Sequence, residues 1–222
     1  MEDPPAPKRQ RRSAEGQGLS KKRARAPNNP VPSAKRSRKS ANLLAEELLG
    51  SKKPVTDQSL LRVLRAWRFT ENTNRINVTP IDETFVYSDT LGLVSSRTGV
   101  VSASRQTKLY PAVFRLMAAW VAGAWPLLPF PFTSISVNFN YAARIHRDAL
   151  NVGPSLTRAF GEYRGGALKY WGDDDGCLSL DELRKLPATV LATGDALCLF
   201  DGRRAHQADA VSIFEFGGMK VS

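Results

Sequence analysis

The stretch that decides the fold runs from Ser134 to Trp171 and has the sequence SISVNFNYAARIHRDALNVGPSLTRAFGEYRGGALKYW. Near its middle lies His146-Arg147-Asp148. Successive side chains of an extended strand point to opposite faces, so residues two apart share a face. We therefore expect the imidazole of His146 and the carboxylate of Asp148 to point to one side of the strand, and Arg147 to the other.

The chain contains two histidines, and the second is His206, in the segment FDGRRAHQADA. Two histidines and one carboxylate that leave other coordination positions open form the facial triad of non-heme Fe(II) sites. The pattern predicts an iron site formed by His146, Asp148 and His206. A structural alternative stays open, in which His146 is a surface strand residue and His206 lies in a loop beside Arg203 and Arg204.

Three segments also carry a family resemblance: NFNYAARIHRDALNVGPSLTRAFGEYRGGALKYW, LFDGRRAH and the final GGMKVS. Together they resemble the TET/JBP-like branch of the 2-oxoglutarate- and Fe(II)-dependent dioxygenases, over roughly residues 76–222. The resemblance implies a double-stranded β-helix with a metal His-x-Asp early in it and a second metal His late. It implies an enzyme that uses Fe(II), 2-oxoglutarate and O2, with ascorbate as an optional reductant. His146, Asp148 and His206 would then be both the metal ligands and the catalytic residues.

The end of the chain departs from that family's pattern. In the family an Arg shortly after the second metal His, often in Arg-x-Ser, holds the distal carboxylate of 2-oxoglutarate. The matching positions here are Lys220 and Ser222, so the resemblance implies that these two residues bind the co-substrate. A lysine offers one point charge where an arginine offers a two-pronged fork. The alternative is an ordinary lysine near a fraying terminus, because we expect the chain to end inside its last strand; Arg158 or Arg204 would then be candidates.

The resemblance also implies a substrate, namely the methyl group of a nucleic-acid base of the 5-methylcytosine or thymine type. An enzyme that oxidises a base must take it out of the stack and hold it between apolar or aromatic groups. Tyr141, Tyr163, Tyr170 and Trp171 lie near the His-x-Asp motif in sequence. Two alternatives stay open: a 2-oxoglutarate hydroxylase of a protein or small molecule, and a non-enzymatic incomplete relative that binds chromatin.

The positive charge is concentrated at the start of the chain. Residues 1–53 hold 14 Lys/Arg and 5 Asp/Glu, a net charge of +9, whereas residues 54–222 hold 18 and 16, a net charge of +2. We expect residues 1–40 to form a disordered basic leader, because few large apolar side chains are present to offset the entropy of ordering.

The basic residues of this leader come in three clusters, at residues 8–12, 21–25 and 35–39. Such clusters are typical of nuclear-import and nucleic-acid-binding segments. We therefore predict nuclear localisation, recognition by the import machinery, and DNA binding through the leader. The alternative is a solubilising tail without a partner.

Residues 41–71 are expected to form a helical lead-in, with one helix over Ala41–Leu49 and another from about Asp57 to Phe69. A further helix is predicted over Tyr110–Trp125. The segment Leu116–Phe132 has no charge over 17 residues, but three prolines interrupt it, and a membrane span needs about 20 continuous helical residues. We expect a buried helix and no interaction with a membrane.

Residues 72–222 are expected to form the dioxygenase domain, of the α+β class with a mainly β core. The expected architecture is a double-stranded β-helix, or jelly roll, with flanking helices. The expected core strands span residues 133–140, 143–147, 156–163, 167–171, 189–192, 196–200, 205–214 and 218–222. A further β-like segment is expected at residues 76–80. The loop Gly172–Leu186 carries Asp173-Asp174-Asp175, which we expect to be solvated.

Overall fold

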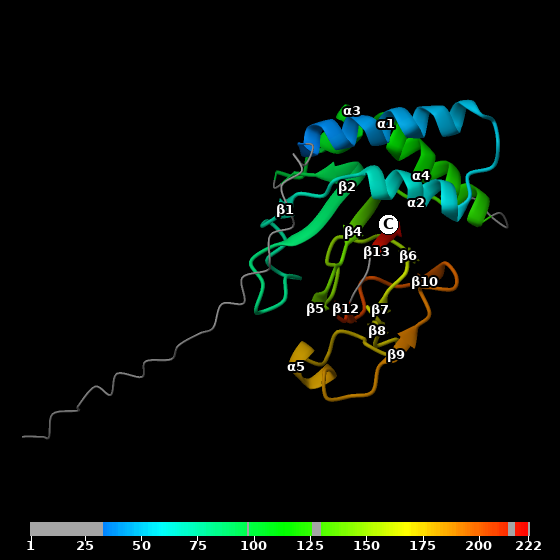
Figure 1. The fold of residues 1–222 in the computed structure, drawn as a ribbon. Helices are drawn as coiled ribbons and strands as arrows, with labels where there is room; N and C mark the ends of the chain where they lie inside the picture. Colours follow the sequence, from blue (N-terminus) through cyan, green and yellow to red (C-terminus); the bar gives the residue numbers. More distant parts are fainter. Residues whose placement is uncertain (1–32, 97, 126–129, 213–215, 222) are drawn as a thin grey trace, which may run out of the picture. The chain divides into compact units, whose positions relative to one another are not determined.

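The computed structural model describes residues 33–96, 98–125, 130–212 and 216–221 (Figure 1). All described residues belong to one compact unit, residues 32–222. Most of the expected leader therefore lies outside the described residues, and its disorder remains a prediction.

Three helices pack together over the largest sheet: α1 (Ala34–Gly50), α2 (Asp57–Ala66) and α4 (Pro111–Ala124) (Figure 1). In α4, Leu116, Met117 and Trp120 are buried in the main core. This agrees with the expected buried helix. Among the described helices, none combines the length and apolar character that a membrane crossing requires.

The expected start of the first helix is wrong. Helix α1 begins at Ala34, not at Ala41, so residues 34–40 are helical rather than part of a disordered leader. The Ser33 hydroxyl caps it by accepting a hydrogen bond from the Arg36 backbone N–H, at 3.3 Å, which satisfies a free amide at the helix start. The third basic cluster therefore belongs to this helix.

A buried ion pair further anchors the start of α1. Arg38 lies on the inner side of the helix, and its guanidinium is 2.6 Å from the carboxylate of Asp89. Trp67 and Gln106 also donate hydrogen bonds to this carboxylate, each at 3.0 Å. Burial raises the pKa of Asp89, while the hydrogen bond from Trp67 and the charge of Arg38 act to lower it.

The larger sheet has seven strands in the order β1-β2-β4-β13-β6-β10, with β3 paired to β2. Their bounds are β1 Glu71–Asn72, β2 Val86–Ser95, β3 Val101–Ala103, β4 Ser134–Phe139, β6 Ser155–Gly161, β10 Cys198–Phe200 and β13 Phe216–Val221. The last strand, β13, is antiparallel to both β4 and β6, with pairing that extends to Val221. Among the described residues, this final strand therefore lies inside the sheet rather than at its edge.

The smaller sheet has four strands in the order β5-β11-β8-β9. Their bounds are β5 Ala143–His146, β8 Leu168–Tyr170, β9 Thr189–Leu191 and β11 His206–Ala208. A separate pair joins β7 (Arg164–Gly165) to β12 (Val211–Ser212), and two short helices are α3 (Arg105–Leu109) and α5 (Leu180–Leu183). The fold is thus α+β with a mainly β core, as expected.

Two local expectations are wrong. Residues 76–80 form a turn instead of a strand, because the backbone N–H groups of Val78 and Thr79 both donate to the carbonyl of Arg75, at 3.1 and 3.0 Å. The acidic run at residues 173–175 is not uniformly solvated, since Asp174 is buried. Its carboxylate is saturated by hydrogen bonds, which offset the cost of removing the charge from water.

Candidate metal centre

Two neighbouring strands of the smaller sheet bring the histidines together. His146 ends β5 and His206 begins β11, and the two residues lie opposite each other in the antiparallel register. Their ring centroids are 4.2 Å apart. Both side chains are buried, so the structural alternative of a surface histidine and a loop histidine does not describe these positions.

Each imidazole is oriented by the backbone carbonyl two residues before it. The Nδ1 atom of His146 lies 2.8 Å from the carbonyl oxygen of Arg144, and Nδ1 of His206 lies 2.9 Å from that of Arg204. Because a carbonyl oxygen can only accept, each Nδ1 carries the proton and donates it. This fixes the tautomer in which the lone pair is on Nε2, the form that binds metals.

The two Nε2 atoms face the same carboxylate. Asp148 Oδ1 lies 3.7 Å from Nε2 of His146, and Oδ2 lies 3.8 Å from Nε2 of His206. These distances exceed the roughly 2.7–3.2 Å of a direct hydrogen bond. One ligand atom from each of the three residues lies within 4.8 Å of the other two. The structure thus brings the three predicted ligands together, and the donor set suits Fe(II) in a facial triad.

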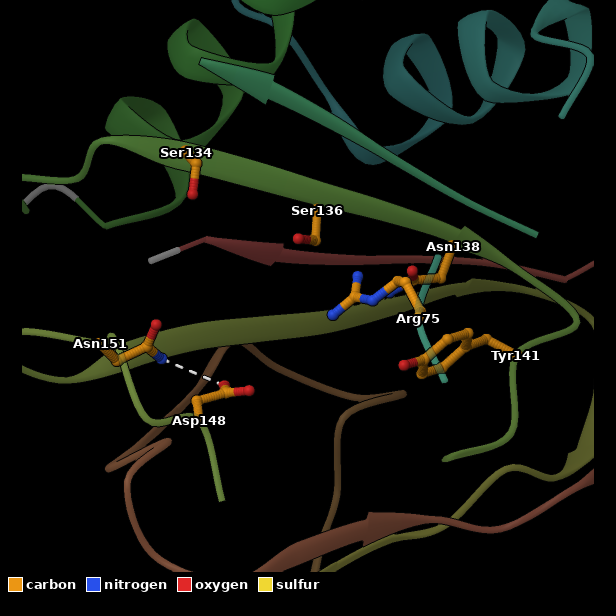
Figure 2. Close-up of a pocket in the computed structure, with 7 residues that line it drawn as sticks. All are labelled: Arg75, Ser134, Ser136, Asn138, Tyr141, Asp148 and Asn151. Atoms are coloured by element: carbon orange, nitrogen blue, oxygen red, sulfur yellow. Dashed lines mark hydrogen bonds between the residues drawn. The ribbon is translucent and has the colours of Figure 1, made fainter. Parts of the chain in front are cut away.

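Asp148 is held by the loop that follows it and by Gly202, which lies between β10 and β11. Its backbone N–H donates to the carbonyl of Gly202 at 2.8 Å. The amide of Asn151 donates to Asp148 Oδ2 and to the hydroxyl of Ser155, both at 3.2 Å (Figure 2). A Cβ atom added to Gly202 would lie 2.6 Å from Asn151 Nδ2 and 3.0 Å from Asp148 Oδ2. Only glycine at this position leaves room for that arrangement.

A polar pocket of about 130 Å³ adjoins Asp148. Seven residues line it: Arg75, Ser134, Ser136, Asn138, Tyr141, Asp148 and Asn151 (Figure 2). Its back wall is one face of β4, because residues 134, 136 and 138 alternate with Ile135 and Val137, which are buried in the core.

Three polar groups in the pocket differ in the chemistry that they offer. The guanidinium of Arg75 extends into the space between β4 and Asp148 and donates one hydrogen bond to the Ser88 hydroxyl at 2.9 Å (Figure 2). Burial raises the pKa of the Tyr141 phenol, so it stays protonated and can donate. Asn138 Oδ1 is buried without a hydrogen-bond partner among the described residues. Such an atom costs about 1–3 kcal/mol unless a ligand satisfies it.

The predicted co-substrate residues are only partly described. The backbone of Lys220 lies in β13 opposite Ser136 of β4 and Thr157 of β6. Its side chain and all of Ser222 lie outside the described residues, so their roles remain predictions. Of the alternative cations, Arg158 binds the carbonyls of Thr193 and Gly194 and the carboxylate of Asp57.

The aromatic residues that we considered for holding a base differ in whether they line the pocket. Tyr141 lines the pocket. The indole of Trp171 donates to the carbonyl of Leu186, and the Tyr170 hydroxyl accepts from the N–H of Asp201. The ring of Tyr170 packs against Phe200, which in turn contacts His206. Tyr170 therefore packs next to the metal ligands through Phe200 and does not line the pocket, and Trp171 packs in the smaller core.

Sequence reasoning missed Arg75 as a pocket residue. It precedes His146 by 71 positions and lies immediately before the segment at residues 76–80 that we expected to be a strand. The alternation at residues 134–138 was a usable signal for the polar wall, since two serines and an asparagine occupy every second position.

The comparisons with known proteins give the following picture. No protein-family model matches the sequence, and no curated protein matches it. Among solved structures, a 2OG-Fe(II) oxygenase family oxidoreductase from Burkholderia pseudomallei is similar at 13% identity, over 74% of this chain and 77% of that chain, with a TM-score of 0.49. NgTET1 in complex with 5mC DNA is similar at 13% identity, over 60% and 59%, with a TM-score of 0.39. A Pseudomonas putida prolyl-4-hydroxylase is similar at 14% identity, over 82% and 97%, with a TM-score of 0.34. At these values the likenesses assign neither a family nor a substrate.

Proposed function

We propose that the chain is a Fe(II)- and 2-oxoglutarate-dependent dioxygenase with a double-stranded β-helix core. The strand order supports this core, because β4-β13-β6-β10 and β5-β11-β8-β9 are two sets of four in which the chain passes repeatedly from one sheet to the other. The observation that carries the proposal is the cluster of His146, Asp148 and His206, whose ligand atoms gather beside a polar pocket.

The three predicted ligands would hold the iron, and the iron would supply the oxidation chemistry. The Nε2 atoms of His146 and His206 and the carboxylate of Asp148 would hold the ion, and the remaining coordination positions stay open for small molecules. Bound Fe(II) supplies the oxidation of a substrate C–H bond by O2, coupled to the conversion of 2-oxoglutarate to succinate and CO2. The protein keeps both imidazoles in the metal-binding tautomer through the carbonyls of Arg144 and Arg204.

The pocket suits a dicarboxylate. The positive charges of Fe(II) and Arg75, less the negative charge of Asp148, balance the two carboxylates of 2-oxoglutarate. Arg75 would bind one of them, with hydroxyl donors nearby on Ser134, Ser136 and Tyr141. Lys220, whose backbone is opposite Ser136, would be a further cation for that same, distal carboxylate, beyond the charges that already balance, and Ser222 would add a hydroxyl.

For the substrate we propose a methylated nucleic-acid base in the nucleus, of the 5-methylcytosine or thymine type. The net charge of +9 over residues 1–53 supports this, because Lys/Arg clusters bind phosphates without sequence preference. Tyr141 supplies one aromatic ring at the pocket. Lys35, Arg36 and Lys39 remain exposed on α1, so three of the four basic residues in the third cluster are available for phosphates or for the import machinery.

The test is co-substrate turnover followed by substrate identification. The full chain, loaded with Fe(II), is incubated with 2-oxoglutarate, O2 and ascorbate, and succinate is measured with 5-methylcytosine DNA or with peptides. We expect succinate and an oxidised base, and loss of both in Asp148→Ala but not in Asp173→Ala, which changes an exposed aspartate nearby. The absence of succinate under all conditions would refute the dioxygenase. Hydroxylated peptide with intact DNA would refute the nucleic-acid substrate alone.

A further inference from the structure

Asp174 lies in the loop after β8, and its side chain is 1% exposed. Four donors saturate its carboxylate. Oδ1 accepts from Arg147 Nη2 at 2.6 Å and from the Gly176 N–H at 3.0 Å. Oδ2 accepts from Arg147 Nε at 2.7 Å and from the Ala205 N–H at 2.6 Å.

Two of these partners, Arg147 and Ala205, are adjacent in the chain to predicted metal ligands. Arg147 lies between the metal ligands His146 and Asp148, and its guanidinium binds Asp174 and the carbonyl of Leu178 rather than either ligand. Ala205 immediately precedes the third ligand, His206. A single carboxylate therefore ties together the two chain segments that carry all three predicted ligands.

Backbone hydrogen bonds provide only part of this tie. Strands β5 and β11 pair at His146–His206 and at Ala143–Ala208, with a register shift between the two pairs. An irregular ladder fixes the relative position of its strands less firmly than a regular one. The fork of Arg147 onto Asp174 adds two parallel charge-assisted hydrogen bonds, which fix orientation as well as distance.

We propose that Asp174 is a positioning residue that sets the spacing between the His146/Asp148 segment and His206. This inference rests on the proposed metal-dependent function. The contacts with Arg147 and with the N–H groups of Gly176 and Ala205 hold the pKa of Asp174 at about 2. The carboxylate is therefore charged at every pH at which imidazoles bind metal.

The chain offers a matched control in its other buried Arg–Asp pair, Arg38–Asp89, with an N–O distance of 2.6 Å. The Asp89 carboxylate accepts hydrogen bonds from Arg38, Trp67 and Gln106, none of which adjoins a predicted metal ligand. Asp89→Asn therefore measures the consequence of breaking a buried ion pair as such, whereas Asp174→Asn also releases the ligand segments.

The experiment measures Co(II) affinity and the visible d–d spectrum of the full chain, both of which report on the ligand geometry without any turnover. Loss of an outer partner of metal ligands lowers affinity by roughly 10- to 100-fold. We expect a loss of that size, with an altered spectrum, for Asp174→Asn, and unchanged affinity and spectrum for Asp89→Asn. Arg147→Lys keeps the charge on Asp174 but loses the fork, so we expect a smaller loss of affinity with the same direction of spectral change.

The possible outcomes distinguish a failure of the Asp174 positioning role from a failure of the proposed metal centre. No Co(II) or Fe(II) binding by the wild type would refute the proposed metal centre. Wild-type binding together with unchanged affinity and spectrum in Asp174→Asn would overturn the positioning role alone. If Asp174→Asn does not fold, Arg147→Lys decides the question, and a wild-type spectrum and affinity in that variant would equally overturn the inference.

Discussion

Gly202→Ala should weaken metal binding through a displacement that the structure defines. The new Cβ would lie 2.6 Å from Asn151 Nδ2, 3.0 Å from Asp148 Oδ2 and 3.3 Å from Ser155 Oγ. Gly202 is not in the left-handed region, so alanine causes no backbone strain there. The whole effect arises from the contact, and the Asn151 amide must move by about 0.8 Å to reach the ordinary distance of 3.4 Å.

That movement breaks the hydrogen bonds of Asn151 to Asp148 and Ser155, which are already 3.2 Å long. A hydrogen bond to a charged group is worth about 1.5–3 kcal/mol. At about 1.4 kcal/mol per tenfold change, metal affinity should fall by roughly 10- to 100-fold. Asn151→Ala removes the same bonds and should give a loss of similar size.

The assay is anaerobic Fe(II) titration of four proteins: wild type, Gly202→Ala, Asn151→Ala and the double variant. In the double variant the losses should not add, because the displaced amide is absent. Gly123→Ala makes the same chemical change in helix α4, where nothing lies within 4 Å, and should leave the affinity unchanged. Wild-type affinity in Gly202→Ala, or full additivity in the double variant, would refute the role of Asn151 in holding Asp148.

Three further predictions concern the pocket, the leader and acid stability. Arg75→Ala should weaken 2-oxoglutarate binding by about 10- to 100-fold, since one charge-assisted contact is lost. Lys220→Ala should also weaken this binding, and Lys220→Arg should keep or improve it. Titration of the charge-transfer band measures the affinity, and wild-type affinity in either alanine variant would show that the residue does not bind 2-oxoglutarate. Deleting residues 1–32 should flatten the salt dependence of DNA binding, because the slope of log affinity against log salt concentration scales with the number of phosphates neutralised. An unchanged slope would indicate that the DNA contacts lie in residues 33–222. The folded-state pKa of Asp174 is about 2, below its ordinary value of 3.8, so the carboxylate's contribution to stability is present above pH 3.8 and is lost as the pH falls toward 2. In acid titrations of the metal-free protein, Asp174→Asn should therefore flatten the dependence of the unfolding free energy on pH in this range. An unchanged profile would contradict the prediction.

Much of the β core follows from local sequence. Alternation of apolar and polar side chains locates β4, β5, β6 and β8 within one or two residues of their expected bounds. The His-x-Asp spacing and the second histidine identify the three residues that the structure gathers. The strands and the His-x-Asp motif depend on neighbours along the chain, which the sequence displays directly, and His206 is identified because it is the only other histidine.

The remaining features depend on contacts between distant segments. Arg38 pairs with Asp89 across 51 positions, and this contact helps to extend α1 into a segment whose composition predicts disorder. Arg75 reaches the pocket from a turn with no motif of its own. Asp174 has an acidic neighbour on each side, and only the fold shows that its carboxylate is buried against Arg147.

The most direct test of the account is the metal stoichiometry of the purified full chain after anaerobic Fe(II) loading and removal of free ion. We expect one Fe(II) per chain in the wild type and none in His206→Ala, with the same far-UV circular dichroism for both proteins, because β11 pairs with its neighbours through backbone hydrogen bonds. Wild-type protein without stoichiometric iron, or His206→Ala with as much iron as the wild type, would contradict the metal centre on which the proposed function depends.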